Sequence, residues 1–468
     1  MTDPDQAGHG DTAAASAELR TLASRAREVA AEVADRLADP GQLAALTTAS
    51  AARSGQPDPW QPVSLTAGYP GVAILQAEAG RPDRAHAHLA AAAAAVPAAS
   101  TTSIYRGYGA LVAGAAAVSD AAGGGYRGLL DRGQRWLAAQ SVAAVRTQRA
   151  LWDAGQDWAD DRFWDTICGV TGPGRLLLAA VLRGQDEHLP ALQEVLAFLV
   201  DLTADANPAG RTPAESARRH SSRPGWWIPP DPDGRHPPGG ADLGVAHGIS
   251  GPLALLAQAH AAGLEVPGQP DAVRGVSAWL LAWQDPDHRW PGIVDPQHDP
   301  AAGADPTRSA WCYGAAGVAS SLLDAGLALG DAGLVGAATA AVAAMGSQHP
   351  DSWQLWGPTV CHGYAGLLAV ASRVAAATGD HTVAGVAATA ARLTLACFAD
   401  NAPWGFRHVH LWGPAGPVAS DVAGLLVGAA GVALALADWV ATVDAPSATT
   451  ASSPARPAPS WRTPLLLG

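Results

Sequence analysis

The sequence has few of the residues that favour β-sheets and few charges. Only four phenylalanines and six tyrosines occur among its 468 residues, and charged residues make up 15% of the chain. Alanine and leucine dominate the apolar stretches, and these residues favour helices, whereas β-branched and aromatic residues favour strands. Because 48% of the residues are hydrophobic, enough apolar surface is available for a large core. We therefore predict an all-α fold.

Basic residues are also scarce. The formal net charge of −13 argues against nucleic acid as a partner, because nucleic-acid-binding proteins present a basic face to the phosphates. The first residues contain neither the basic nor the apolar segment of a secretory signal. The most apolar stretch, around 422–437, is shorter than the roughly 20 residues that span a bilayer. We expect a cytoplasmic protein without a transmembrane segment.

A short glycine motif recurs along the chain. Each copy, Gly-x-x-Gly, follows a loop and precedes a run of small apolar residues, and in several copies an amphipathic stretch comes next. The copies begin at Gly68, Gly107, Gly169, Gly248, Gly314, Gly363 and Gly428, the second being degenerate. A repeated unit buries its apolar face by stacking on its neighbours. We therefore predict an α/α toroid, a double ring of about seven inner and seven outer helices.

Two explanations fit the paired glycines. Residues three apart lie on one face of a helix, so the missing side chains could allow neighbouring helices to pack closely. They could also keep the mouth of the toroid wide enough to admit a peptide. Both explanations predict the same sequence pattern.

The repeats divide the chain into three parts. Residues 1–16 are small and polar and predict a disordered N-terminus, whereas residues 17–443 contain the repeats and form the toroid domain. Within that domain the proline-rich stretch 205–242 predicts an irregular insertion beside the mouth. Residues 444–468 are rich in Pro, Ala, Ser and Thr, a composition that does not build a packed element, so we expect a disordered tail.

Side chains suited to catalysis lie just before several of the glycine pairs. If the inner helices run parallel around the ring, their N-terminal ends meet at one rim, and residues far apart in the sequence converge there. Helix N-termini carry partial positive charge, which favours thiolates, carboxylates and a developing oxyanion. The residues within about six positions before a glycine pair are Asp165, His247, Arg308, Cys312, Cys361 and His362.

Two of the four cysteines occupy the same position of the repeat. In a cytoplasmic protein, cysteines are more often metal ligands or buried thiols than disulfides. Cys312, Cys361 and the adjacent His362 offer two thiolates and one imidazole, a set that binds zinc and leaves its fourth position open, as in catalytic zinc sites. Zinc favours ionisation of a bound thiol and so supplies a reactive thiolate near neutral pH. We predict a Zn²⁺ site at one end of the toroid.

The other candidates each have a catalytic and a structural interpretation. His247 is a general acid or base, because imidazole titrates near neutral pH, or it binds loop carbonyls. Asp165 either orients His247 and holds a proton or caps a helix. Arg308 either neutralises a carbonyl oxygen of the substrate or pairs with an acid. Tyr313 either donates its hydroxyl hydrogen or packs. The residue types alone leave these alternatives open.

The remaining cysteines and two histidines are expected to play no part in the site. Cys168 precedes a repeat glycine but has no histidine neighbour, so we expect a buried thiol, and Cys397 is expected in the core. His408 and His410 lie in a loop rich in Trp and Pro and are expected to face solvent. The sequence contains neither a P-loop nor a Gly-x-Ser-x-Gly nucleophile elbow.

Three motifs occur together within the glycine repeat. They are Trp-Cys-Tyr-Gly at 311–314, Cys-His-Gly at 361–363 and Ala-His-Gly-Ile-Ser-Gly at 246–251. With them the chain resembles the lanthionine synthetase C family, the LanC-type lanthipeptide cyclases, over about residues 60–440. The resemblance implies an α/α barrel with zinc at one end. Members of the family add a cysteine thiol of a ribosomal peptide to a dehydroalanine or dehydrobutyrine, which forms a thioether ring (lantibiotics are made in this way).

The resemblance also implies roles for single residues. It assigns zinc binding to the two cysteines and the histidine described above. His247 and Asp165 would transfer protons, and His247, or a water that it positions, would protonate the α-carbon. Arg308 and Tyr313 would help to stabilise the enolate or to orient the substrate. The chain departs from the family at Cys168, where members often carry an acidic residue.

The partners implied by the resemblance are peptides and other biosynthetic proteins. They are a dehydrated ribosomal precursor peptide, a separate lanthipeptide dehydratase and an exporter, in a complex at the membrane surface. An alternative is a non-catalytic LanC-like zinc protein that binds thiols or modified peptides. A prenyltransferase-like zinc toroid is a third option, but that class uses one Asp, one Cys and one His, which the two-cysteine pattern does not match.

Overall fold

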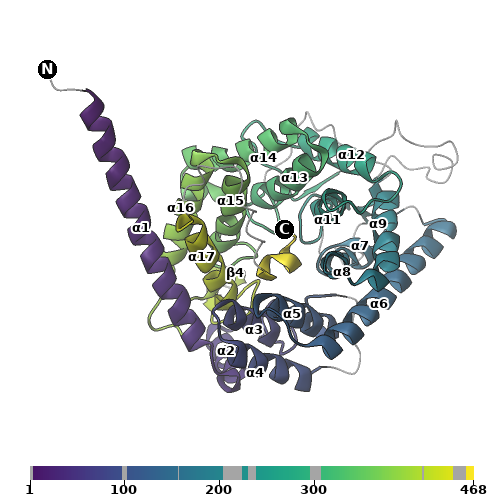
Figure 1. Cartoon of the computed structure of the whole chain (residues 1–468), viewed down its shortest axis with the longest axis horizontal. Helices are drawn as coiled ribbons and strands as arrows, with labels where there is room; N and C mark the ends of the chain where they lie inside the picture. Colours follow the sequence, from purple (N-terminus) through teal and green to yellow (C-terminus); the bar gives the residue numbers. More distant parts are fainter. Residues whose placement is uncertain are drawn as a thin grey trace.

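Helices dominate the structure and form two concentric rings around a central axis (Figure 1). The structure is a computed structural model. It describes residues 4–96, 103–156, 158–203, 224–229, 239–295, 307–413, 416–445 and 460–467, without the side chains of 4–15 and 411–413. The predicted α/α toroid is confirmed.

The inner ring consists of seven helices within the described part of the chain. They are α3 (Tyr69–Glu78), α5 (Gly107–Ala121), α8 (Thr171–Leu182), α11 (Ser250–Ala261), α13 (Ala315–Leu329), α15 (Tyr364–Thr378) and α17 (Ala429–Val443). Most of their side chains are buried, because small and branched apolar residues follow each glycine pair. Neighbours pack on one another, as α11 packs on α13 and α15 on α17, and α17 packs on α3. The first and last repeats are therefore adjacent.

A second set of helices covers the inner ring from outside. Six of them follow their inner partner in the sequence, whereas α1 packs on α17 and so joins the two ends of the domain. An ion pair of 2.6 Å between Arg27 and Asp444 supports this contact. The outer helices are α1 (Pro4–Arg36), α4 (Pro82–Ala94), α6 (Arg127–Asp153), α9 (Leu189–Thr203), α12 (Gln269–Ala282), α14 (Ala332–Ala344) and α16 (His381–Ala396).

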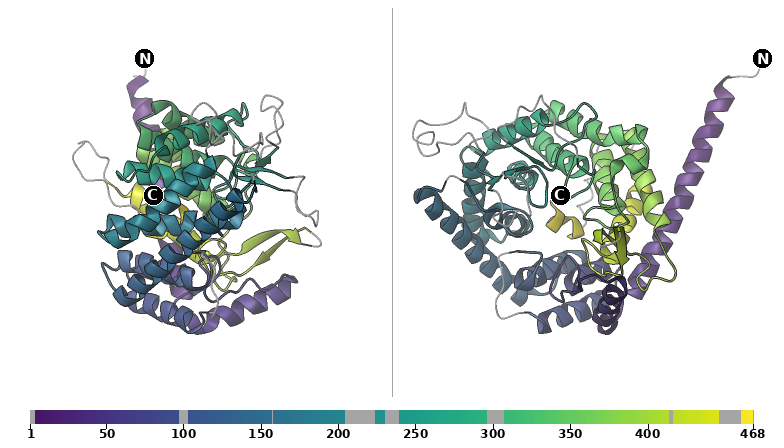
Figure 2. Two further views of the ribbon diagram at one scale, coloured as in Figure 1. Left: turned by 90° about the vertical axis from the view of Figure 1, so that its right-hand side faces the viewer. Right: turned by 180° about the vertical axis from the view of Figure 1, so that it is seen from behind.

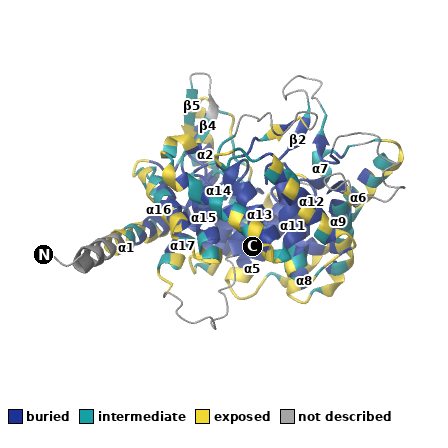
Figure 3. Ribbon diagram, turned by 90° about the horizontal axis from the view of Figure 1, so that it is seen from above, coloured by how far each residue is buried: buried dark blue, intermediate teal, exposed yellow. Residues whose placement is uncertain are grey.

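Short elements complete the described chain. The strands form two antiparallel sheets, β1-β2-β3 and β4-β5, which lie at the same end of the ring (Figure 3), and β4-β5 projects from it (Figure 2). The remaining helices are α2 (Pro40–Ser54), α7 (Asp161–Trp164), η1 (Asp186–His188), η5 (Met345–Ser347), η6 (Pro350–Trp353) and η7 (Ser460–Leu465). The strands are β1 (Trp227–Ile228), β2 (Gly240–Asp242), β3 (Ile293–Val294), β4 (His408–Gly413) and β5 (Gly416–Ser420).

The second glycine of every repeat accommodates the loop that precedes its own helix. At each of these glycines, the carbonyl oxygen six residues earlier lies within 2.7 Å of the position that a Cβ would take. A real Cβ does not approach an oxygen so closely, so only glycine fits. The pairs are Leu65–Gly71, Ser103–Gly109, Thr166–Gly172, Val245–Gly251, Trp311–Gly317, Val360–Gly366 and Leu425–Gly431. The tight loop, more than packing between neighbouring helices, therefore explains the motif.

The same spacing corrects the register of the second repeat. Gly109 holds the place of the second glycine, so this copy runs from Arg106 to Gly109, and Arg106 is the N-cap of α5. The pattern that starts at Gly107 is one residue out of register because Gly107 stands inside the first helical turn. The copy is degenerate only at its first position.

The prediction of a disordered tail over 444–468 is wrong for its last residues. Residues 460–467 include η7 and lie at the centre of the ring (Figure 1). Trp461, Leu465, Leu466 and Leu467 are buried, because one tryptophan and three consecutive leucines are apolar enough to enter the core. The average composition of the tail conceals this short apolar end. Residues 446–459 lie outside the described residues.

Two further predictions concern segments that the structure describes in part. Helix α1 begins at Pro4 and so includes most of the stretch 1–16 that we expected to be disordered, because several alanines there favour a helix. Of the stretch 205–242, residues 224–229 and 239–242 are described and contain β1 and β2, which pair with each other. Within the described ranges, every helix is too short or too polar to span a bilayer.

Candidate functional site

The seven loops that precede the inner helices are joined to one another by hydrogen bonds. The bonds form a closed circle, because Ser103, which donates to the loop before α8, belongs to the same loop as Tyr105, which accepts from the loop before α3. We call it the rim circle. Its bonds run from Leu65 N to Tyr105 O, Leu425 N to Leu65 O, Cys361 N to Leu426 O, Cys312 N to Cys361 O, Val245 N to Cys312 O, Thr166 Oγ1 to Val245 O and Ser103 Oγ to Ile167 O. The candidate residues are thus held on one rim.

Cys312, Cys361 and His362 form a compact group, the Cys–Cys–His cluster. One ligand atom of each lies within 4.8 Å of the other two. The Cys312 side chain is buried, whereas Cys361 and His362 are half-buried, so the cluster is accessible from one side. Two thiols and an imidazole at this separation fit a tetrahedral zinc ion with one position open to substrate.

The electrostatic environment favours ionisation of one of the two thiols. Hydrogen bonds from Cys361 and His362 and the charge of Arg308 lower the pKa of Cys312 to about 5, although burial opposes ionisation. The hydrogen bond to Cys312, together with burial, raises the pKa of Cys361. Cys312 is therefore the first thiolate of the pair. Arg308 is half-buried, and its positive charge favours the thiolate form of both cysteines.

Asp165 and His247 form a hydrogen-bonded pair on the same rim. His247 Nδ1 lies 2.6 Å from Asp165 Oδ2. The other oxygen of Asp165 accepts hydrogen bonds from the backbone N–H groups of Cys168 and Gly169, and the carboxylate is fully buried. The side chain of His247 is 38% exposed. Asp165 therefore orients the imidazole, while the rest of the ring can meet a substrate.

The carboxylate also affects the charge of the imidazole. Burial alone would lower the pKa of His247, but the hydrogen bond to Asp165 and the nearby charges of Asp165 and Asp242 raise it above its ordinary value. A larger fraction of His247 is therefore protonated near neutral pH than in a free histidine. A carboxylate-supported imidazolium is suited to donate a proton.

Cys168 is exposed, and the expectation of a buried thiol is wrong. Its ligand atom lies within 4.8 Å of those of Asp165 and His247, and we call these three the Asp–Cys–His cluster. Partial burial and the charge of Asp165 raise the pKa of Cys168 to about 11, so it is a neutral thiol near pH 7. The sequence could not reveal its exposure, because the short loop between α7 and α8 turns it outward.

Sequence reasoning missed Asp242, which lies beside Tyr313. The Tyr313 hydroxyl donates to Asp242 Oδ2 at 2.8 Å, and Gly244 N donates to Asp242 Oδ1 at 2.8 Å. Burial raises the pKa of Asp242 to about 7. Burial and this carboxyl also raise the pKa of Tyr313, so the hydroxyl stays protonated. Asp242 precedes Gly248 by six residues, so the position that identified the other candidates could have identified it as well.

His408 is buried, and the expectation that it faces solvent is wrong. The β4-β5 hairpin brings its ring 5.0 Å from that of His362 and 4.4 Å from that of His410, both edge to face. Burial and the two neighbouring imidazoles lower the pKa of His408 to about 2, so the ring is neutral. It therefore packs against the Cys–Cys–His cluster as an uncharged group.

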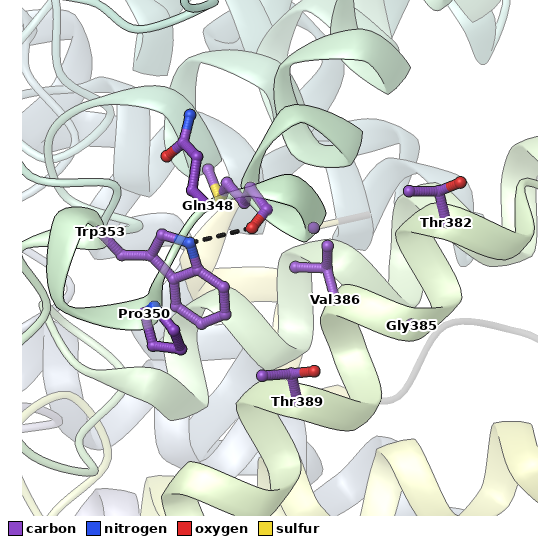
Figure 4. Close-up of a pocket in the computed structure, with 9 residues that line it drawn as sticks. Gln348, Pro350, Trp353, Thr382, Gly385, Val386 and Thr389 are labelled. Atoms are coloured by element: carbon purple, nitrogen blue, oxygen red, sulfur yellow. Dashed lines mark hydrogen bonds between the residues drawn. The ribbon is translucent and has the colours of Figure 1, made fainter.

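A cavity lies beside the outer helix α16 (Figure 4). It has a volume of about 340 Å³ and is formed by α16 and the segment that contains η5 and η6, where Trp353 donates to Met345 O at 3.2 Å. Its lining includes Pro350, Thr382 and Val386, and none of the lining residues titrates. The cavity carries no group for acid–base or metal chemistry.

Comparisons with known proteins agree with this arrangement. Residues 59–450 match a family model described as lanthionine synthetase C-like protein. Among solved structures, nisin cyclase has a similar fold, with a TM-score of 0.65 and 18% sequence identity over 89% of this chain and 94% of that chain. No curated protein sequence matches the chain significantly. At 18% identity, the structural match shows a shared fold.

Proposed function

The chain belongs to the lanthionine synthetase C-like family, and from that premise we propose that it is a Zn²⁺-dependent lanthionine synthetase. It joins a cysteine thiol of a dehydrated ribosomal precursor peptide to a dehydroalanine or dehydrobutyrine and so makes a lanthionine or methyllanthionine ring. The observation that carries this proposal is the presence, on one rim, of a thiol–imidazole cluster and a carboxylate–imidazole pair.

The Cys–Cys–His cluster supports zinc as the cofactor. Cys312, Cys361 and His362 would hold the ion and leave one coordination position for the substrate. When bound, zinc lowers the pKa of a substrate thiol and so makes the sulfur nucleophilic near neutral pH. The rim is accessible to a peptide, because Cys168 is exposed and His247 is partly exposed.

The reaction forms one C–S bond and one C–H bond, breaks the S–H bond of the thiol and the π bond of the dehydro residue, and so needs no redox cofactor. The sulfur adds to the β-carbon of the dehydro residue, negative charge develops on the amide oxygen, and a proton is added to the α-carbon. His247, held through Nδ1 by Asp165, delivers that proton from its other nitrogen. Arg308 and Tyr313 act on the amide oxygen, and Tyr313 does so by sharing the hydrogen that it donates to Asp242.

The same proposal places the protein in a biosynthetic sequence for lanthipeptides such as lantibiotics. Its substrate contains dehydrated serine or threonine, so a separate dehydratase must act first, and an exporter acts on the finished peptide. We place the reaction in the cytoplasm, where a complex with these proteins would lie at the membrane surface. One toroid domain, over residues 17–443, carries the activity.

A synthetic peptide with one dehydroalanine and one cysteine tests the proposal. Ring closure does not change the mass, so free thiols are counted by the mass added on alkylation, while the zinc content of the protein is measured by elemental analysis. We expect one zinc per chain and loss of the free thiol at a rate that falls in His247→Ala. If the zinc-loaded protein binds the peptide but consumes its thiol no faster than buffer alone, it is a binding protein. A wild type without zinc would contradict both the cyclase and the zinc-binding protein.

A further inference from the structure

The C-terminal residues 460–467, with η7, lie inside the inner ring (Figure 1). We propose that this segment, the C-terminal plug, closes the toroid at the end opposite the candidate site and positions the loop that carries Cys312. The second part rests on the proposed function, because it concerns a candidate zinc ligand.

The plug is anchored at its outer end to the C-terminal halves of inner helices. The Ser460 hydroxyl donates to Glu78 Oε1 at 2.6 Å, and Glu78 is the last residue of α3. Arg462 Nε donates to Asp438 Oδ2, on α17, at 2.7 Å, and the two side chains are only 10% and 8% exposed. A charge pair removed from water is costly to separate, so these contacts fix where the plug enters the ring.

The inner end of the plug contacts two loops of the rim circle. The Tyr105 hydroxyl donates to Pro464 O, and Trp311 Nε1 donates to Leu465 O at 3.0 Å. Both aromatic side chains are fully buried. Tyr105 and Trp311 lie in the loops before α5 and α13, and these two loops are not neighbours along the rim circle. The plug therefore links them from inside the ring.

Trp311 carries this contact to the candidate metal site. It immediately precedes Cys312, and its carbonyl oxygen lies against Gly317 in the first turn of α13. With the indole held by Leu465 and the backbone held by α13, the Cys312 backbone has little freedom to move. A ligand that is positioned before the metal arrives binds it more tightly, since less ordering is needed on binding.

The plug also packs between two inner helices, α5 and α8, that have few contacts with each other. α5 and α8 contact each other less than either contacts η7. The space left between the plug and these two helices is about 10 Å³, no more than one water molecule needs. On the side of α11, Gln258 Nε2 donates both to Leu466 O and to Asp324 Oδ2, each at 2.9 Å. A peptide therefore has to enter and leave at the rim.

Substitution of Trp311 by Phe tests the positioning role without removing the plug. Trp311→Phe keeps the aromatic ring but removes the donor to Leu465 O. We expect the affinity for Zn²⁺, measured by competition with a chelator, to fall by about 10–100-fold, as for other residues that orient a metal ligand. The matched control is Trp290→Phe, because Trp290 is equally buried and donates to Leu280 O at 2.8 Å. We expect the control to keep the wild-type affinity.

A chain that ends at residue 459 tests the plug as a whole. We expect the backbone amides of 310–313 to exchange hydrogen faster than in the full chain, with zinc affinity reduced at least as far as in Trp311→Phe. The proposal is overturned if Trp311→Phe binds zinc within twofold of the full chain and if hydrogen exchange at 310–313 is unchanged in the shortened chain. If the shortened chain does not fold, the Trp311→Phe comparison decides alone. A wild type that binds no zinc contradicts the proposed function, and exchange in the metal-free protein then decides about the plug.

Discussion

The Cys–Cys–His and Asp–Cys–His clusters satisfy the same geometric condition for a metal site and differ in their chemistry. In both, three potential ligand atoms lie within 4.8 Å of one another on the same rim. In the Cys–Cys–His cluster, the two thiols have each other and His362 as polar partners. In the Asp–Cys–His cluster, Asp165 already accepts two backbone N–H groups on one oxygen and bonds His247 through the other.

The difference shows that separation alone does not make a metal site. A cation in the Asp–Cys–His cluster would have to displace the His247–Asp165 hydrogen bond and ionise Cys168, whose pKa is about 11. In the Cys–Cys–His cluster the pKa of Cys312 is about 5, so one thiolate is formed readily. The Asp–Cys–His cluster is suited to hold a proton and the Cys–Cys–His cluster to hold a soft metal ion.

The largest expected effect is the loss of zinc when a cysteine of the Cys–Cys–His cluster, but not that of the Asp–Cys–His cluster, is replaced. Cys361→Ala should lower the affinity for zinc by more than about 100-fold, because even residues that only orient a ligand contribute about 10–100-fold. Cys168→Ala, the matched change in the other cluster, should retain one zinc per chain. Elemental analysis after dialysis measures both. Zinc lost from Cys168→Ala and kept in Cys361→Ala would reverse the two assignments.

Removal of the imidazole should affect turnover and leave the metal in place. His247→Asn should lower kcat by about 10²–10⁴-fold, the usual contribution of a positioned general acid, with unchanged zinc content. His349→Asn is the control, because His349 is an exposed histidine that belongs to neither cluster. Rates are measured by thiol alkylation of a dehydroalanine peptide. Equal rates for His247→Asn and wild type would rule out His247 as the proton donor.

A smaller change is expected when only the charge of the orienting carboxylate is removed. Asp165 raises the pKa of His247, so Asp165→Asn should lower that pKa and move the alkaline limb of the pH–rate profile to lower pH. In the wild type, the raised pKa adds stability that is full below the unfolded value and is lost as pH rises through the folded value. Asp165→Asn should abolish this pH-dependent term. Titration of the His247 ring by NMR measures the shift, and an unchanged pKa would contradict the pairing.

The smallest effect is expected at the thiol of the Asp–Cys–His cluster. Cys168→Ser should change the free energy of unfolding by less than about 0.5 kcal/mol, because the side chain is exposed. It should also leave zinc content and turnover close to wild type. In the wild type, Cys168 should react slowly with iodoacetamide at pH 7.5, because a thiol with a pKa of about 11 is almost entirely protonated. Rapid alkylation there would show that the thiol is activated.

Much of the fold and of the Cys–Cys–His cluster could be predicted from the chain alone. The paired glycines mark every inner helix, since each second glycine meets the carbonyl oxygen six residues earlier. Parallel inner helices place the preceding residues on one rim, which is why Cys312 and Cys361 meet although they are 49 positions apart in the sequence. Both signals are local, because they depend on spacing within a repeat and on ligand type.

The rest depended on contacts between distant segments. The pairing of Asp242 with Tyr313, 71 residues away, exists only in the folded chain. His408 is buried because a hairpin folds over His362. The place of the last leucines inside the ring is fixed by Trp311 and Gln258, which donate hydrogen bonds to their carbonyl oxygens.

The repeat and the residue types therefore determined the toroid, the shared rim and the presence of soft metal ligands. Only the tertiary structure decided which acceptor atoms are already occupied, which of Cys168 and His408 is exposed, and what fills the axis. The physical reason is that helix spacing and ligand chemistry are properties of short segments. Burial, pKa and the use of each hydrogen-bonding group depend instead on side chains that the closed ring brings together from all parts of the chain.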